Sequence, residues 1–170
     1  YKKFIEQNDY YPRINRIRYL AEEKIYLRNN SPTSIINWFE KYPPLGGLGK
    51  IKLAEAYLEQ GKIEKVKELV QDGWITAEIR KNDLGYYRAK FKKFISSEDH
   101  VKRADYLAWE RKYWDLKRML RYLPTDQRAL YNARQILMSN SYGVDNAIAK
   151  VPQYLKKDPG LEFDRLRWRN

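Results

Sequence analysis

Apolar residues recur at the spacing of an α-helix along nearly the whole chain, and the apolar–polar alternation typical of strands is scarce. Only 8 Gly and 7 Pro interrupt the 170 residues, so the periodic stretches are long enough to form helices. Hydrophobic residues make up 43% and charged residues 33% of the chain. That balance is typical of a folded chain rather than a disordered one, so we expect an all-α fold.

Capping signals divide this pattern into short helices. Ser31 followed by Pro32 predicts an N-cap and a first helical turn, and this helix should end before Pro43. Ser96 with Asp99 resembles a capping box in which Asp replaces the usual Glu. Four further boundaries are predicted: Pro12 at a first helical position, a break at Gly73–Trp74 before a short helical piece around 75–79, Thr125 as an N-cap, and Gly143 as a helix end. A last helix should begin at Asp158–Pro159 and reach Trp168.

Short connections between amphipathic stretches predict antiparallel helix hairpins. Gly61 is suited to a left-handed helix end and separates a helix over about 48–58 from one that begins at Ile63. A turn this short folds the second helix back on the first. The same order of small residues, turn and aliphatic stripe recurs at offsets of 50 and 31 residues. We therefore expect one domain over residues 1–170, an α-α superhelix that is a right-handed solenoid of short antiparallel hairpins. The unequal offsets predict a degenerate superhelix rather than a strict repeat array.

The overall charge points to an anionic partner. The net charge is +12, and residues 86–170 carry more of it than residues 1–85. A basic surface attracts nucleic acid, anionic glycan or acidic protein alike. The absence of cysteine excludes disulfides, thiolate zinc sites and cysteine nucleophiles. We find no secretory leader and no apolar run of about 20 residues that would span a membrane, and we expect the chain to be a piece of a longer protein.

Residues that resemble catalytic or metal-binding groups have structural interpretations that we prefer. His100 follows Glu98 and Asp99 in a predicted first helical turn, where acidic residues offset the helix dipole. The acidic pairs Glu22–Glu23 and Glu162 with Asp164 lie among basic residues of amphipathic helices, so we expect them to be solvated. We expect no catalytic residue, no metal site and no cofactor in this chain.

Two segments are stronger candidates for binding. The glycine-rich stretch 42–50 precedes a helix, as phosphate-binding loops do, but lacks their Lys-Ser/Thr pair, so a tight connection is the preferred interpretation. The 15 tyrosines lie among Lys and Arg and serve either packing or stacking on a ligand. The C-terminal basic run is our candidate surface for a ligand or for docking of another domain; it comprises Arg165, Arg167, Trp168 and Arg169.

Four stretches together resemble the N-terminal superhelical domain of the soluble lytic murein transglycosylases. They are 53–61 with Gly73-Trp74-Ile75; Glu98-Asp99-His100-Val101 with 103–110; Arg128-Ala129-Leu130 with Ala133-Arg134, Val144-Asp145 and Ala147-Ile148; and Asp158-Pro159-Gly160-Leu161 with 164–169. The last stretch is the most specific, and the resemblance extends from about residue 14 onward.

The resemblance implies a bacterial, periplasmic protein that acts on peptidoglycan. Members of that family cleave between N-acetylmuramic acid and N-acetylglucosamine and leave a 1,6-anhydromuramoyl end without using water. A Glu in a separate C-terminal lysozyme-like domain serves as acid and then base. The Glu-Ser and Gly-Leu-Met-Gln segments of that domain are absent from this sequence, so no catalytic residue is carried over. The implied partners are glycan strands or stem peptides and the catalytic domain itself.

Two alternatives remain from the residues alone. A scaffold of the tetratricopeptide type fits the Ala–Gly–aliphatic pattern, although a regular 34-residue period is absent. A single-stranded RNA-binding helical repeat fits the charge and the aromatic residues. The unequal offsets argue against repeated base-reading positions, so we expect no nucleic-acid partner.

Overall fold

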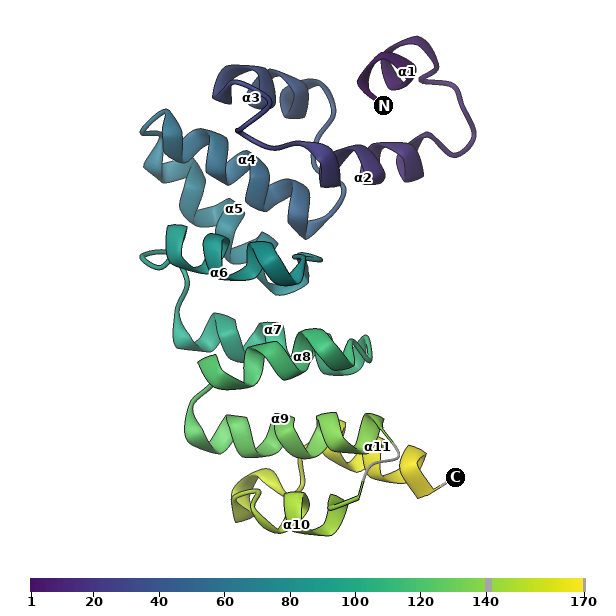
Figure 1. Ribbon diagram of the computed structural model, residues 1–170, viewed down its shortest axis with the longest axis vertical. Helices are drawn as coiled ribbons and strands as arrows, with labels where there is room; N and C mark the ends of the chain where they lie inside the picture. The colour runs from purple at the N-terminus through teal and green to yellow at the C-terminus, as the bar shows by residue number, and fades with distance from the viewer. Residues whose placement is uncertain (140–141, 170) are drawn as a thin grey trace. The chain divides into compact units, whose positions relative to one another are not determined.

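The computed structural model describes residues 1–139 and 142–169 (Figure 1). Every regular element in these ranges is helical, which confirms the predicted all-α class. None of the described helices has both the length and the apolar character needed to cross a membrane. The chain forms two compact units, Tyr1–Ile95 and Ser96–Asn170. The single domain expected over residues 1–170 stays a prediction.

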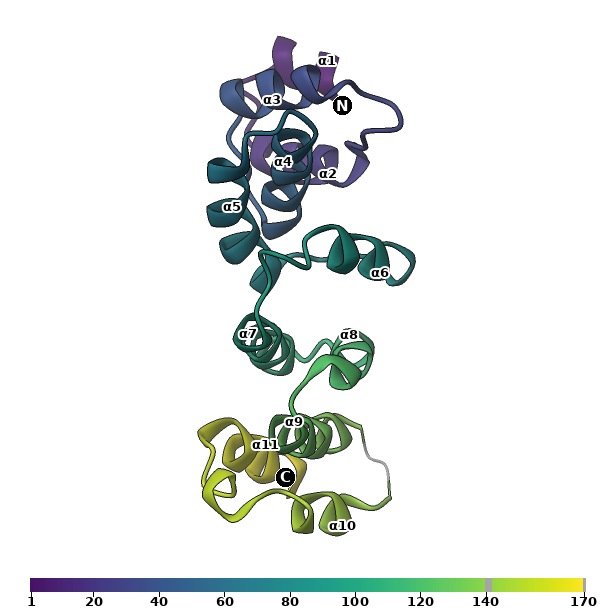
Figure 2. The same ribbon diagram turned by 90° about the vertical axis from the view of Figure 1, so that its left-hand side faces the viewer.

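The first unit is built around one helix that is buried on most of its surface. The helices of this unit are α1 (Lys2–Gln7), α2 (Ile14–Lys24), α3 (Pro32–Lys41), α4 (Gly47–Glu59), α5 (Ile63–Thr76) and α6 (Lys81–Lys90). Helix α4 packs against α2, α3 and α5, and both views show α4 and α5 side by side (Figures 1 and 2). Gly61 has a φ of +71° in the turn between them, so the predicted left-handed end of α4 and the α4–α5 hairpin are confirmed.

Helix α5 continues through Gly73 and Trp74, so the predicted break and the helical piece after it are both wrong. The reason is a close approach of two backbones: a Cβ at Gly73 would lie 2.9 Å from the carbonyl oxygen of Gly47 on α4. The lack of a side chain at Gly73 therefore allows α4 to pack closely against α5, and it does not end α5. Trp74 is fully buried, and the chain leaves the helix only at Ala77, which is extended.

The second unit is arranged around a different central helix. Its elements are α7 (Ser97–Trp109), α8 (Tyr113–Met119), the 3₁₀ turn η1 (Leu120–Tyr122), α9 (Thr125–Met138), α10 (Val144–Ala149), the 3₁₀ turn η2 (Gln153–Leu155) and α11 (Pro159–Arg169). Helix α9 packs against α7, α8, α10 and α11. A central helix that packs against several other helices is thus common to both units.

Side-chain caps explain which boundaries the sequence predicted well. Ser31 accepts a hydrogen bond from the amide of Ser34 at 3.2 Å, and Ser96 and Asp99 form the predicted reciprocal capping box.

Three other predicted helix boundaries were wrong. Pro12 lies in a turn before Arg13, Pro124 rather than Thr125 precedes α9 as its N-cap, and Gly143, with a φ of +93°, precedes α10 instead of closing α9.

Candidate functional site

The structure brings together three of the four residues of the predicted C-terminal surface. Arg165, Trp168 and Arg169 share one face of α11 and line a cavity of about 30 Å³, which is room for about one water molecule. Arg167 lies on another face and is exposed. A cavity this small encloses no sugar or peptide, so contact with a ligand or domain here would be made by an open surface. That role stays a prediction.

The acidic pairs are not solvated as predicted, because one member of each is buried. Glu22 and Asp164 are each 3% exposed. Burial raises the pKa of the Glu22 carboxyl, and hydrogen bonds from the amides of Leu45 and Gly46 oppose that rise. Burial likewise raises the pKa of Asp164, and the guanidinium of Arg134 opposes it.

The glycine-rich stretch 42–50 binds an anion that belongs to the chain itself. The amide of Leu45 donates to Oε1 of Glu22 at 2.6 Å, and the amide of Gly46 donates to Oε2 at 3.2 Å. A Cβ at Gly49 would overlap the same carboxylate. The amides and the glycines of this turn therefore hold Glu22, which agrees with the preferred interpretation of the stretch as a connection.

His100 and its acidic neighbours have a structural role. Asp99 caps the first turn of α7 through Ser96, and Glu98 forms an exposed ion pair with Lys102 at 2.7 Å. The His100 ring packs against Tyr122 with a centroid distance of 5.8 Å. Among the described residues, no three His, Asp or Glu side chains gather as they would around a metal ion.

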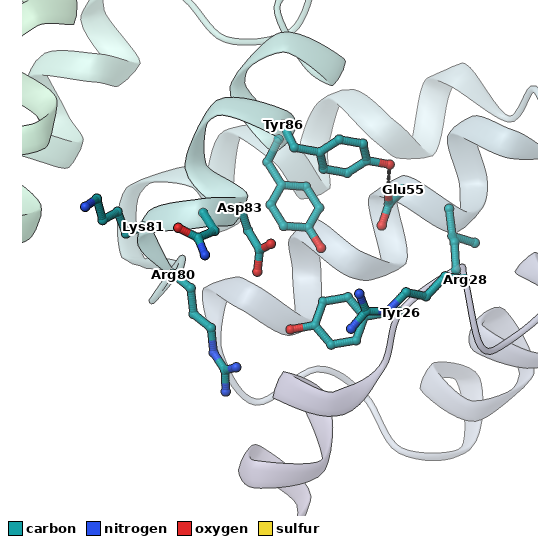
Figure 3. Close-up of a pocket in the computed structure, with 10 residues that line it drawn as sticks. Tyr26, Arg28, Glu55, Arg80, Lys81, Asp83 and Tyr86 are labelled. Carbon is teal, nitrogen blue, oxygen red and sulfur yellow. Dashed lines mark hydrogen bonds between the residues drawn. The ribbon is translucent and has the colours of Figure 1, made fainter.

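A pocket that the sequence did not predict lies in the first unit. It measures about 560 Å³, a volume typical of small-ligand sites. Three segments form it: the loop after α2, the middle of α4, and the first turns of α6. Figure 3 shows the side chains of Tyr26, Glu55, Asp83 and Tyr86 turned toward a common hollow, whereas Lys81 points away from it. We call this the Tyr26–Tyr86 pocket, and the residues used to define it are Tyr26, Arg28, Glu55, Asp83, Tyr86 and Tyr87.

One wall of the Tyr26–Tyr86 pocket is a hydrogen-bonded cluster. Tyr86 donates its hydroxyl hydrogen to Oε1 of Glu55 (Figure 3). Nζ of Lys90 lies 3.2 Å from the same oxygen. Lys90 also donates to Glu59 at 2.7 Å. Burial alone would lower the pKa of Lys90, but these hydrogen bonds and the charge of Glu55 raise it above its ordinary value. Lys90 is therefore charged at neutral pH, and the cluster holds the Tyr86 ring in place.

A buried cation lies beneath the pocket. Lys52 is 1% exposed, donates from Nζ to the carbonyl oxygen of Glu23 at 2.8 Å, and lies 3.8 Å from the ring centroid of Tyr26. Burial lowers the pKa of Lys52 to about 8, while the carboxylates of Asp83 and Glu55 oppose the shift. The positive charge of Lys52 thus acts on the carboxylates of Asp83 and Glu55 from beneath the pocket.

Sequence reasoning missed this pocket because its residues come from three segments that are far apart in the chain. Tyr26, Glu55 and Asp83 are separated by 29 and 28 positions, so no local motif joins them. The one local signal is the succession of charged, polar and aromatic side chains over 80–87. That stretch is dense in ligand-binding residue types but is compatible with an ordinary helix surface.

We found no match to this chain among protein-family models, curated proteins or solved structures.

Proposed function

We propose that this chain is a non-catalytic α-α superhelical domain of a bacterial lytic murein transglycosylase, located in the periplasm. In this proposal its short antiparallel hairpins form a solenoid that binds peptidoglycan and positions it for cleavage by a separate C-terminal domain. The chain itself performs no bond cleavage.

A network around Arg134 is the observation that carries this proposal. Arg134 donates from Nε to Asp164 and from Nη1 to Asp105, each at 2.8 Å. A Cβ at Gly160 would overlap its guanidinium. These residues belong to the second, third and fourth of the stretches that resemble the transglycosylase domain. Residues that carry the resemblance are therefore interdependent in space, which supports a shared fold better than isolated matches on helix surfaces.

The charge and the Tyr26–Tyr86 pocket supply the binding part of the proposal. Peptidoglycan presents sugars, which stack on aromatic rings, and peptide carboxylates, which pair with Lys and Arg. The net charge of +12 favours capture of such a polymer from a distance. The pocket adds tyrosine rings and charged groups of both signs at one place.

Co-sedimentation of the chain with purified peptidoglycan sacculi, at low and at raised salt, tests the proposal. We expect retention that weakens but persists at raised salt, and a supernatant without anhydro-muropeptides. A carboxylate cation-exchange resin and insoluble chitin serve as matched solids, because the first offers charge alone and the second sugar alone. If the resin retains the chain as well as sacculi do, and raised salt abolishes both, then the binding is explained by charge alone and the proposal is overturned. Release of an anhydro product would contradict the non-catalytic assignment.

A further inference from the structure

The Tyr26–Tyr86 pocket presents an acidic group whose charge acts on the buried ammonium of Lys52 but which forms no direct contact with a cation within the described residues. Within the described residues, the carboxylate of Asp83 takes part in no ion pair or side-chain hydrogen bond, and Figure 3 shows it facing the hollow between Tyr26 and Tyr86. Glu55, the other acid of the lining, is already engaged by Tyr86 and Lys90. A bound cationic group would therefore meet Asp83 first.

The pocket also presents a cation that is not neutralised by a carboxylate. The guanidinium of Arg28 lies 4.6 Å from the ring centroid of Tyr26, and within the described residues it forms no ion pair. Arg80 lies on the other side of Tyr26 in Figure 3 and reaches Glu23 only at 3.4 Å. The cation–π contact with Tyr26 holds the Arg28 guanidinium at the pocket, and a guanidinium can bind a carboxylate through two parallel hydrogen bonds.

An anion and a cation on either side of aromatic rings complement a ligand that carries both charges on a short apolar body. A neutral sugar can stack on the rings and hydrogen-bond to both side chains through its hydroxyls, but it brings no charge to pair with either of them. We propose that the Tyr26–Tyr86 pocket binds the zwitterionic end of a short peptide, with its ammonium group at Asp83 and its carboxylate at Arg28. The identification of this peptide as a stem peptide of peptidoglycan rests on the proposed function; the pocket's preference for a zwitterion does not.

Isothermal titration calorimetry of the full chain with three probes tests this inference. The probes are a stem peptide whose terminal diamino acid has a free ammonium and carboxylate, the same peptide as its C-terminal amide, and an N-acetylglucosamine tetramer. We expect the free peptide to bind, amidation to weaken binding about tenfold or more, and the sugar to bind more weakly than the free peptide. A charge-assisted hydrogen bond of about 1.5–3 kcal/mol corresponds to that factor.

Two single variants assign the contacts to the pocket. Asp83→Asn and Arg28→Gln should each weaken the free peptide about tenfold or more, and Arg28→Gln should have little effect on the amide. Asp9→Asn and Arg13→Gln repeat the same chemical changes at exposed positions of the same unit and should leave binding unchanged. Circular dichroism of each variant establishes that it is folded, and Arg28→Lys, which keeps the charge, replaces the glutamine variant if that one does not fold.

The outcomes separate this inference from the proposed function. Peptide binding that Asp83→Asn and Arg28→Gln leave intact would overturn the pocket assignment, and so would tighter binding of the sugar than of the peptide. Sacculus binding without peptide binding would overturn this inference and leave the proposed function standing. Peptide binding at the pocket without sacculus binding would overturn the proposed function and leave the pocket's preference for a zwitterion standing.

Discussion

Arg134 and Asp164 form an ion pair that is almost completely removed from solvent. Nε of Arg134 lies 2.8 Å from Oδ2 of Asp164, and the two side chains are 0% and 3% exposed. The pair joins α9 to α11, and Asp105 on α7 accepts a second hydrogen bond from the same guanidinium. Three helices of the second unit therefore depend on one side chain.

Removing one partner of this pair should destabilise the second unit. Asp164→Ala removes the buried carboxylate that pairs with the Arg134 guanidinium and leaves that charge buried. We expect a loss of about 3 kcal/mol in the free energy of unfolding. Urea denaturation followed by tryptophan fluorescence measures it, because Trp109 lies 5.0 Å from the Arg134 guanidinium carbon. Asp145→Ala is the exposed control. An apolar double variant, Arg134→Met with Asp164→Leu, should recover much of the loss; a still larger loss would show that the charges themselves are needed.

Gly160→Ala should also destabilise the chain, against the ordinary preference of helices for alanine. The added Cβ overlaps the guanidinium of Arg134, whereas a Cβ at Gly85 of α6 meets open space. We expect Gly85→Ala to be neutral or to stabilise by up to about 1 kcal/mol, and Gly160→Ala to cost about 1–3 kcal/mol. Thermal unfolding compares the two. Equal effects of the two substitutions would contradict the packing argument.

Loss of the Glu22 carboxylate should loosen the connection between α3 and α4. Glu22→Ala deprives the amides of Leu45 and Gly46 of their acceptor in a half-buried place, at a cost of about 3 kcal/mol. Glu22→Gln keeps one acceptor oxygen and should cost about half as much. Urea unfolding gives both values, with Glu40→Ala on the exposed face of α3 as control. Hydrogen exchange at the Leu45 and Gly46 amides should rise in the alanine variant; unchanged protection would refute this account.

Lys52 should make the stability of the first unit depend on pH. Its pKa is about 8 in the folded chain against an ordinary value of 10.5. Between these values the unfolded chain binds more protons, so this group adds stability as pH rises. Relative to Lys52→Met, the wild type should gain about 2 kcal/mol between about pH 7.5 and about pH 10. Urea unfolding at constant ionic strength measures the difference.

Comparison with that variant removes opposing contributions from other groups. Burial raises the pKa of Tyr87 and of Tyr131 above their ordinary value of 10.0, so these phenols lower stability at higher pH in both proteins alike. Lys67→Met, at an exposed position of α5, should run parallel to the wild type. Parallel curves for the wild type and Lys52→Met would show that the ammonium is not held in the way the structure indicates.

The arginines of the α11 face should contribute to peptidoglycan capture through charge. Replacing Arg165 and Arg169 together by glutamine should reduce retention on sacculi at low salt and have little effect at raised salt. The double variant Arg13→Gln with Arg16→Gln removes the same charge from α2 and its cap. A greater loss for the α11 pair would support it as a docking surface, and equal losses would reduce its role to net charge.

The parts of the fold that the sequence predicts well are those that local chemistry decides. Ser31 and Ser96 cap helices through atoms within three residues, and Gly61 adopts the left-handed conformation that its turn requires. Periodicity alone identifies most helices for the same reason. Thr125 is misassigned because the choice between it and Pro124 depends on the backbone of a single residue.

The parts that are mispredicted depend on partners distant in sequence. From sequence, Gly73 is interpreted as a helix break, but in the structure it is where the backbone of Gly47 approaches α5. Glu22 is expected to be solvated, but it accepts a hydrogen bond from the amide of Leu45. The Tyr26–Tyr86 pocket is missed for the same reason, since Tyr26 and Asp83 meet only after α4, α5 and α6 have packed. Local sequence patterns do not specify which distant residues will come into contact.

The overlap between a Cβ at Gly160 and the Arg134 guanidinium has an evolutionary consequence. Neither position is free to change alone: a side chain at 160 displaces the arginine, and loss of the arginine strands Asp164 and removes the reason for the glycine. In any lineage that shares this arrangement, the two positions should substitute together or not at all. Statistical coupling between columns 134 and 160 would therefore record the packing of α9 on α11.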